Sequence, residues 1–151
     1  MTSNEKNTST LIHLSTLTQY FIPFGNFIFP IIIWSSKKNE SEFVNYNGKQ
    51  VLNFQLSMFL YTLLLLLISI LTLIFTVLKN VPYNEFFDTH HVAFENVNHE
   101  NLTGALILAI SAISVFIFLK TIEFILIIYG AVKASNGENY KYPLSIPFFK
   151  Q

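Results

Sequence analysis

Hydrophobic residues are gathered into three long blocks, which shorter polar segments separate. The blocks cover residues 11–34, 51–78 and 102–132. Each block is longer than the run of about 20 apolar residues with which an α-helix crosses a bilayer. The pattern predicts an all-α membrane domain of about three hydrophobic helices over residues 11–134. A polar tail at 1–10, an outer loop at 79–101 and a C-terminal tail at 135–151 complete the predicted organisation.

The second block carries the clearest signal, because residues 51–78 include no charged side chain. As an α-helix this stretch would be about 42 Å long, whereas the hydrocarbon layer of a bilayer is about 30 Å thick. The sequence therefore predicts an integral membrane protein whose main partner is the lipid bilayer.

The first block is interrupted by Pro23 and Pro30, with Gly25 and Asn26 between them. A proline inside a helix removes one backbone hydrogen bond and collides with the preceding turn. We therefore expect a break near Ile22, which leaves this helix kinked or folded back as a re-entrant hairpin of two short halves. A complete crossing would place the N-terminus outside the cell, and a re-entrant hairpin would return it to the cytoplasm.

Lysine positions predict the orientation, because cytoplasmic loops of membrane proteins carry an excess of Lys and Arg. Lysines lie between the first two blocks and again after the third, at Lys37, Lys38, Lys49, Lys133, Lys141 and Lys150. We therefore expect loop 35–50 and the C-terminus to be cytoplasmic in a multi-pass protein of the bacterial plasma (inner) membrane.

Composition excludes several classes of function. The chain has 151 residues, zero formal net charge, 52% hydrophobic and 12% charged residues, and no cysteine. A neutral chain lacks the basic surface that nucleic-acid binding needs, and a chain without cysteine forms no disulfide or thiolate metal site. The sequence also lacks a Gly-x-Ser-x-Gly elbow and a glycine-rich phosphate loop. We expect neither enzymatic activity nor a cofactor.

The third block contains two charged residues, Lys120 and Glu123, in otherwise apolar surroundings. A charge at the centre of a membrane helix costs about 2.5 to 3.5 kcal/mol, so the two side chains should pair across one turn. Tyr61 of the second block is expected at a similar depth, which predicts an intramembrane cluster of Tyr61, Lys120 and Glu123. Its role is a neutralised structural pair, a proton or ion relay, or a docking site for a charged partner helix.

Other polar side chains in the blocks have two interpretations each. A stripe of polar residues follows one face of the second helix and marks either a packing seam or a solvated path; it comprises Asn53, Ser57, Tyr61, Ser69, Thr72 and Thr76. His13 is expected to be an interfacial or interhelical hydrogen-bonding residue. The outer loop holds His90, His91 and His99, but their spacing matches no recognised metal motif, so no metal site is predicted.

Three segments carry a family resemblance: "FIPFGNFIFPIIIW", "FVNYNGKQVLNFQLS" and "AVKASNGENYKYPLSIPF". Together they resemble a bacterial family of small uncharacterised membrane proteins similar to the Tic-twenty component of the chloroplast inner-envelope translocon. The resemblance implies a helical protein with few membrane spans. In physical terms, Asn45, Asn47 and Gly48 suit a turn before the second helix. The C-terminal aromatic residues suit the lipid boundary; they are Tyr140, Tyr142, Phe148 and Phe149.

These observations predict a non-enzymatic scaffold or subunit of a membrane assembly, with protein translocation as the context that the resemblance implies. Its partners would be other membrane proteins or further copies of the same chain. The alternative is a small oligomeric transporter or channel subunit, in which the Lys120 and Glu123 pair would line the path.

Overall fold

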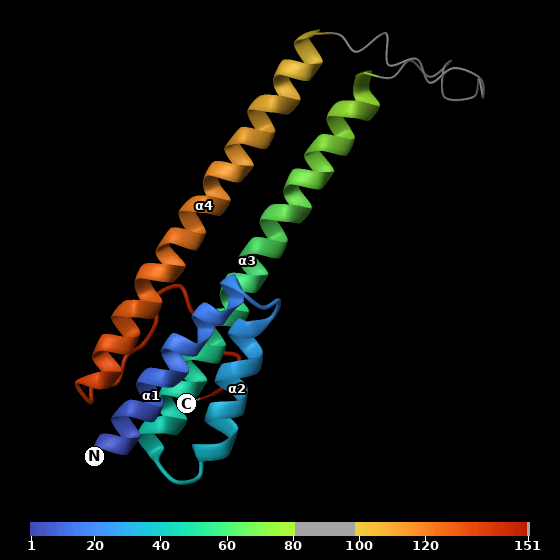
Figure 1. The fold of residues 1–151 in the computed structure, drawn as a ribbon. Helices are drawn as coiled ribbons and strands as arrows, with labels where there is room; N and C mark the ends of the chain where they lie inside the picture. Colours follow the sequence, from blue (N-terminus) through green and yellow to red (C-terminus); the bar gives the residue numbers. More distant parts are fainter. Residues whose placement is uncertain (81–98, 151) are drawn as a thin grey trace. The chain divides into compact units, whose positions relative to one another are not determined.

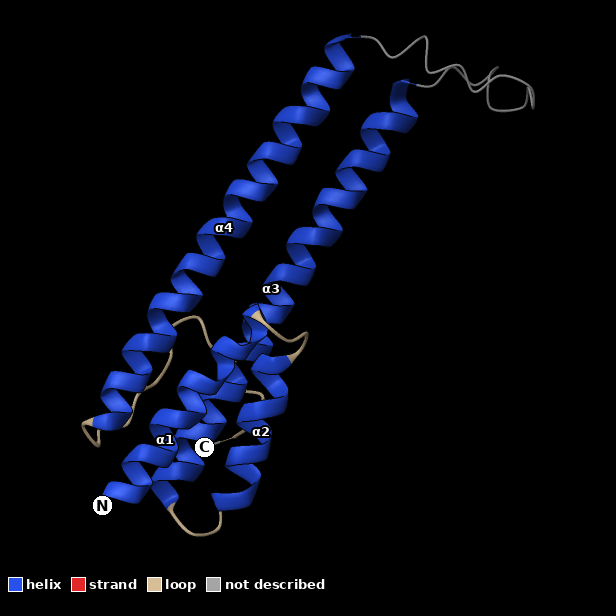
Figure 2. Ribbon diagram, in the orientation of Figure 1, coloured by secondary structure: helices blue, strands red, loops and turns tan. Residues whose placement is uncertain are grey.

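The computed structural model describes residues 1–80 and 99–150, which are mostly helical (Figures 1 and 2). The helices are α1 (Ser3–Ser15), the 3-10 helix η1 (Thr16–Tyr20), α2 (Gly25–Lys37), α3 (Glu42–Asn80) and α4 (His99–Ser135). Within these described ranges no residue is in a β-strand, so the predicted all-α fold is confirmed. The predicted histidine group of the outer loop lies outside the description, since His90 and His91 precede residue 99 and the side chain of His99 is not described.

The chain divides into two compact units, each with its own packing. The first comprises Met1–Tyr61 and Leu119–Gln151, and the second comprises Thr62–Phe118. The first unit therefore holds α1, η1, α2, the beginning of α3, the end of α4 and the C-terminal segment. The second unit holds the rest of α3 and α4.

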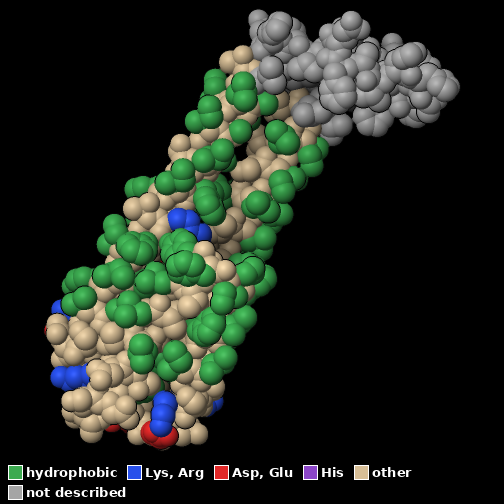
Figure 3. Space-filling view, in the orientation of Figure 1, with side chains coloured by type: hydrophobic (Ala, Val, Ile, Leu, Met, Phe, Trp, Pro, Cys, Tyr) green, Lys and Arg blue, Asp and Glu red, His purple; other side chains and the backbone are tan. Residues whose placement is uncertain are grey.

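Two helices are long and apolar enough to cross a membrane, namely α3 over Glu42–Thr76 and α4 over Thr103–Ser135. Large apolar side chains remain exposed along both of them, for example Leu71 and Ile110 in the second unit. Hydrophobic side chains accordingly cover much of the visible helical surface (Figure 3). Such a surface is suited to lipid rather than water. Two such helices are fewer than the three that the sequence predicted.

The missing third span is a helical hairpin. The first hydrophobic block forms α1, η1 and α2, and α1 and α2 lie side by side (Figure 1). The break falls at Phe21–Phe24, where Phe24 adopts a left-handed conformation with φ of 59°. Of the two alternatives for this block, the structure has the fold-back and not a single kinked helix.

Two boundaries of the first block differ from expectation. Pro30 does not break the helix: α2 continues through it, and its ring is buried. Burial of the ring and packing against neighbouring helices offset the one lost backbone hydrogen bond. Residues 3–10 are not a tail but the first turns of α1, which Thr2 and Glu5 begin with a reciprocal capping box.

The core of the first unit draws on α1, α3, α4 and the C-terminal segment. Its buried members are Ile12, Val44, Val51, Phe54, Met58, Ile127 and Tyr142. The rings of Phe54 and Tyr142 stack with centroids 4.2 Å apart and an interplanar angle of 7°. Tyr142 was expected at the lipid boundary, and this expectation is wrong. The stacking contact removes its ring from both lipid and water.

The C-terminal segment, residues 136–150, returns along α3 after Gly137 ends α4 with a φ of 83°. Four residues of α3, spaced one helical turn apart, bind its backbone. Lys49 Nζ donates to the Lys150 carbonyl (3.0 Å), and the Asn53 amide donates to the Phe149 carbonyl (3.1 Å) and accepts from its N–H (2.7 Å). Ser57 Oγ accepts from Ile146 N–H (2.8 Å), and Tyr61 Oη donates to the Leu144 carbonyl (2.9 Å).

The predicted polar stripe of α3 is therefore a packing seam over its first half, but its partner is an extended segment and not another helix. Over its second half, hydroxyl groups of the stripe donate to carbonyls of α3 itself: Ser69, Thr72 and Thr76 donate to the carbonyls of Leu65, Ile68 and Thr72. Such bonds satisfy a hydroxyl group inside its own helix.

Candidate functional site: two buried polar clusters

The first polar cluster is centred on His13 of α1, which is fully buried. Its Nδ1 lies 2.7 Å from the hydroxyl of Tyr142, and its Nε2 lies 3.0 Å from Oδ1 of Asn47 on α3. The amide nitrogen of Asn47 donates to the Phe43 carbonyl (2.9 Å), which fixes the orientation of the amide. The expectation that His13 makes interhelical hydrogen bonds is confirmed.

These contacts determine the proton positions in the His13 cluster. The Asn47 oxygen can only accept, so His13 carries its proton on Nε2 and donates to it. Nδ1 then accepts from the hydroxyl of Tyr142. Burial raises the pKa of Tyr142 well above 10, so its hydroxyl remains a donor.

Gly130 of α4 allows the His13 cluster to form. A Cβ atom at this position would lie 2.8 Å from Tyr142 Oη, 2.9 Å from His13 Nδ1 and 3.0 Å from a ring carbon of Tyr140. Real Cβ atoms do not approach other atoms this closely. The absence of a side chain at Gly130 therefore lets α4 pack directly against the hydrogen bond between α1 and the C-terminal segment.

The second polar cluster contains the charged pair of α4. Lys120 Nζ lies 2.8 Å from Glu123 Oε2, and the Glu123 side chain is fully buried while that of Lys120 is 29% exposed. Gln19 of η1 completes the cluster: its amide nitrogen donates to Glu123 Oε1 (3.0 Å) and its oxygen accepts from Lys120 Nζ (3.3 Å). The hairpin thus supplies hydrogen bonds to both members of the pair.

The structure brings together Lys120 and Glu123, as the sequence predicts, but gives Tyr61 another role. The Tyr61 hydroxyl donates to the Leu144 carbonyl and so holds the C-terminal segment. Gln19 takes the place that the prediction gave to Tyr61. Its position could not be inferred from helical periodicity, because η1 lies beyond the end of α1 and approaches α4 only after the chain folds.

The predicted turn at Asn45, Asn47 and Gly48 is wrong, since all three lie inside α3. Asn45 accepts a hydrogen bond from the Trp34 indole (3.1 Å), and a Cβ on Gly48 would collide with the same ring. These residues therefore hold α2 against α3. Amide side chains and a glycine suit close helix packing as well as a turn, and the local sequence does not distinguish the two.

The second unit contains a groove of about 350 Å³ between α3 and α4. Leucine, isoleucine, valine and alanine side chains line most of it, with Ser69, Thr72 and Ser111 among them. The described residues include no group of three or more His, Asp or Glu side chains that could hold a metal ion. The mostly apolar lining of the groove is suited to apolar material such as acyl chains.

Two apolar helices with lipid-suited surfaces, a helical hairpin and two internally bonded polar clusters define a small helical membrane protein. Residues 4–149 match the model of the MamF/MmsF family, described as the magnetosome magnetite crystal formation protein family. The chain belongs to this family. The resemblance to relatives of the Tic-twenty translocon component is therefore wrong, and translocation loses its support. Neither a curated protein nor a solved structure matches the chain.

Proposed function

We propose that this protein is a non-enzymatic subunit of a membrane assembly, and that it acts in the membrane associated with magnetite crystal formation. The family description supplies the mineral context. The non-enzymatic role is supported by what the side chains of the two polar clusters bind. They bind other side chains of the same chain and so hold α1, η1, α4 and the C-terminal segment together; the residues are His13, Tyr142, Lys120 and Glu123.

We also propose an orientation, with loop 35–50, the C-terminus and the N-terminus on the cytoplasmic side. The lysine distribution supports the first two placements. The hairpin supports the third, because it returns the chain to the side from which it starts.

The assembly role is tested by purifying the tagged chain from its native membrane in mild detergent and crosslinking it. We expect a complex larger than a monomer, with reproducible crosslinks to membrane proteins or to other copies of the chain. The mineral role is tested separately, by expressing the chain in a magnetite-forming host that lacks its own family member and measuring crystal size by electron microscopy. Restored crystal size is expected. A monomer without crosslinks would contradict the first role, and unchanged crystals the second.

The alternative of a transporter or channel subunit draws on one observation, the Lys120 and Glu123 pair in the interior of an apolar helix. Ion or proton flux measured with the purified chain in vesicles decides between the two. A subunit that only holds an assembly together should give no flux above that of empty vesicles.

A further inference from the structure

The tip of the N-terminal hairpin presents apolar side chains to its surroundings. Phe21 is 88% exposed and Phe24 is 64% exposed, and Tyr20 and Ile22 beside them are about half exposed. Pro23 lies between the two phenylalanines. A contiguous group of this kind at the end of a hairpin is too apolar for water and is suited to the hydrocarbon of a bilayer.

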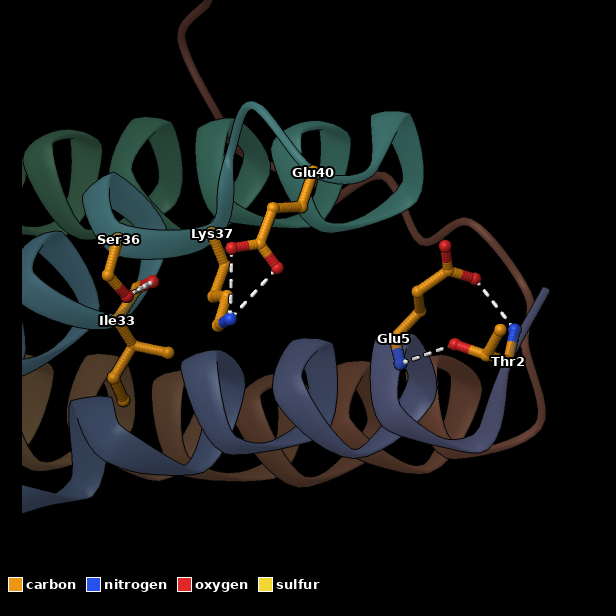
Figure 4. A network of polar contacts seen from close by, with 6 residues as sticks. All are labelled: Thr2, Glu5, Ile33, Ser36, Lys37 and Glu40. Atoms are coloured by element: carbon orange, nitrogen blue, oxygen red, sulfur yellow. Dashed lines mark hydrogen bonds and ion pairs between the residues drawn. The ribbon is translucent and has the colours of Figure 1, made fainter.

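The opposite end of the hairpin is polar. Figure 4 shows the capping box of Thr2 and Glu5 near the ion pair of Lys37 and Glu40, which is 2.8 Å long and exposed. Lys6 reaches the Asn136 carbonyl from the same end of α1. The charged groups belong in the headgroup layer or in water, so both limbs of the hairpin begin and end on one side of the membrane.

Each limb is about as long as half of the hydrocarbon layer is thick. The limb from Leu11 to Tyr20 combines the end of α1 with η1 and rises about 17 Å. The limb from Gly25 to Trp34 rises about 15 Å as an α-helix. The hydrocarbon layer is about 30 Å thick, so a hairpin of this length that starts at one surface does not reach the other.

The hairpin is fixed against the helices of the first unit. The Asn26 amide donates to Gln55 Oε1 (2.8 Å), the rings of Phe27 and Phe59 meet edge to face, and Gln19 binds the charged pair of α4. The hairpin is therefore held to the parts of α3 and α4 that belong to the first unit. These two helices add to both leaflets when they cross the bilayer, whereas the hairpin adds two further helices to one leaflet only.

We propose that the hairpin lies in a single leaflet and makes the protein favour membranes whose surface on the hairpin side is convex. Volume inserted into one leaflet expands that leaflet relative to the other, and a convex surface accommodates the difference. With the orientation proposed above, the convex surface faces the cytoplasm. The curvature preference itself does not depend on that orientation or on the mineral role.

Insertion depth is tested with single cysteines, which the cysteine-free chain permits without further changes. Phe21→Cys at the tip and Ser36→Cys at the polar end are labelled with a fluorophore in the full-length protein and reconstituted in vesicles. We expect the tip label to be quenched most by lipids that carry the quencher on the acyl chain. The Ser36→Cys label should be quenched by headgroup quenchers. If unlabelled Phe21→Cys reacts with a membrane-impermeant maleimide on either side, the single-leaflet placement is overturned.

Curvature preference is tested by reconstituting the tagged chain into small sonicated and large extruded vesicles. Protease cleavage of a C-terminal tag gives the fraction of molecules whose hairpin side faces outward. We expect this fraction to rise from near one half in large vesicles to a clear excess in small ones. Phe21→Asn should reduce the excess by drawing the tip toward the headgroups, and Phe21→Leu, the matched control at the same exposed position, should preserve it. An outward fraction independent of vesicle size would overturn the proposal.

Discussion

Replacing Gly130 with alanine should destabilise the first unit by about 2 kcal/mol, although alanine is the better helix former. The new methyl group would occupy the space between Tyr142 Oη, His13 Nδ1 and the Tyr140 ring, all within about 3 Å. Either α4 moves away or the hydrogen bond between His13 and Tyr142 breaks. Because Tyr142 anchors the C-terminal segment, we expect both a lower unfolding temperature and faster trypsin cleavage after Lys141.

Gly104 provides the matched control on the same helix, since a Cβ there would meet no atom within 4 Å. Gly104→Ala should therefore leave trypsin cleavage unchanged and stabilise the helix by up to about 1 kcal/mol, the difference in helix propensity between the residues. Equal effects of the two substitutions would show that the close approach at Gly130 does not matter for stability. They would also remove the argument that α4 is held by the His13 cluster.

The sequence predicts the helices of this protein well and their partners poorly, and the reason is physical. Long apolar runs locate α3 and α4 because lipid burial acts on each helix separately. Pro23 locates the break in the hairpin because its effect on the backbone is local. The contacts of His13 with Tyr142 and of Asn53 with Phe149 join residues far apart in the chain, and no periodicity encodes them.

The same distinction explains two of the expectations that the structure corrects, those for Tyr142 and Tyr61. Tyr142 follows α4 in a segment of tyrosines and lysines, which is typical of a lipid boundary. It is buried because the C-terminal segment reverses direction after α4, which stacks the Tyr142 ring on the ring of Phe54. Tyr61 was expected to lie beside the charged pair of α4, but its hydroxyl donates to the carbonyl of Leu144 as the segment passes. Both outcomes depend on the path of the C-terminal segment, which contains no regular element for the sequence to reveal.

Replacing Glu123 with leucine should cost about 3 to 5 kcal/mol in free energy of unfolding, because it removes the partner of a charge held in apolar surroundings. Lys120 would keep only the Gln19 oxygen at 3.3 Å. The double substitution Lys120→Met with Glu123→Leu should recover most of this loss, since two apolar side chains need no partner. Chemical unfolding in nanodiscs, with helix content as the signal, measures both variants.

The ion pair of Lys37 and Glu40 is the matched control, because it has the same spacing of three residues but is exposed to solvent. Glu40→Gln should change stability little, since water already screens an exposed pair. Recovery by the double variant would show that Lys120 and Glu123 serve mainly to neutralise each other's charge. Vesicles separate this result from transport: if the wild-type chain passes ions and the folded double variant does not, the pair carries the flux and the subunit role is incomplete.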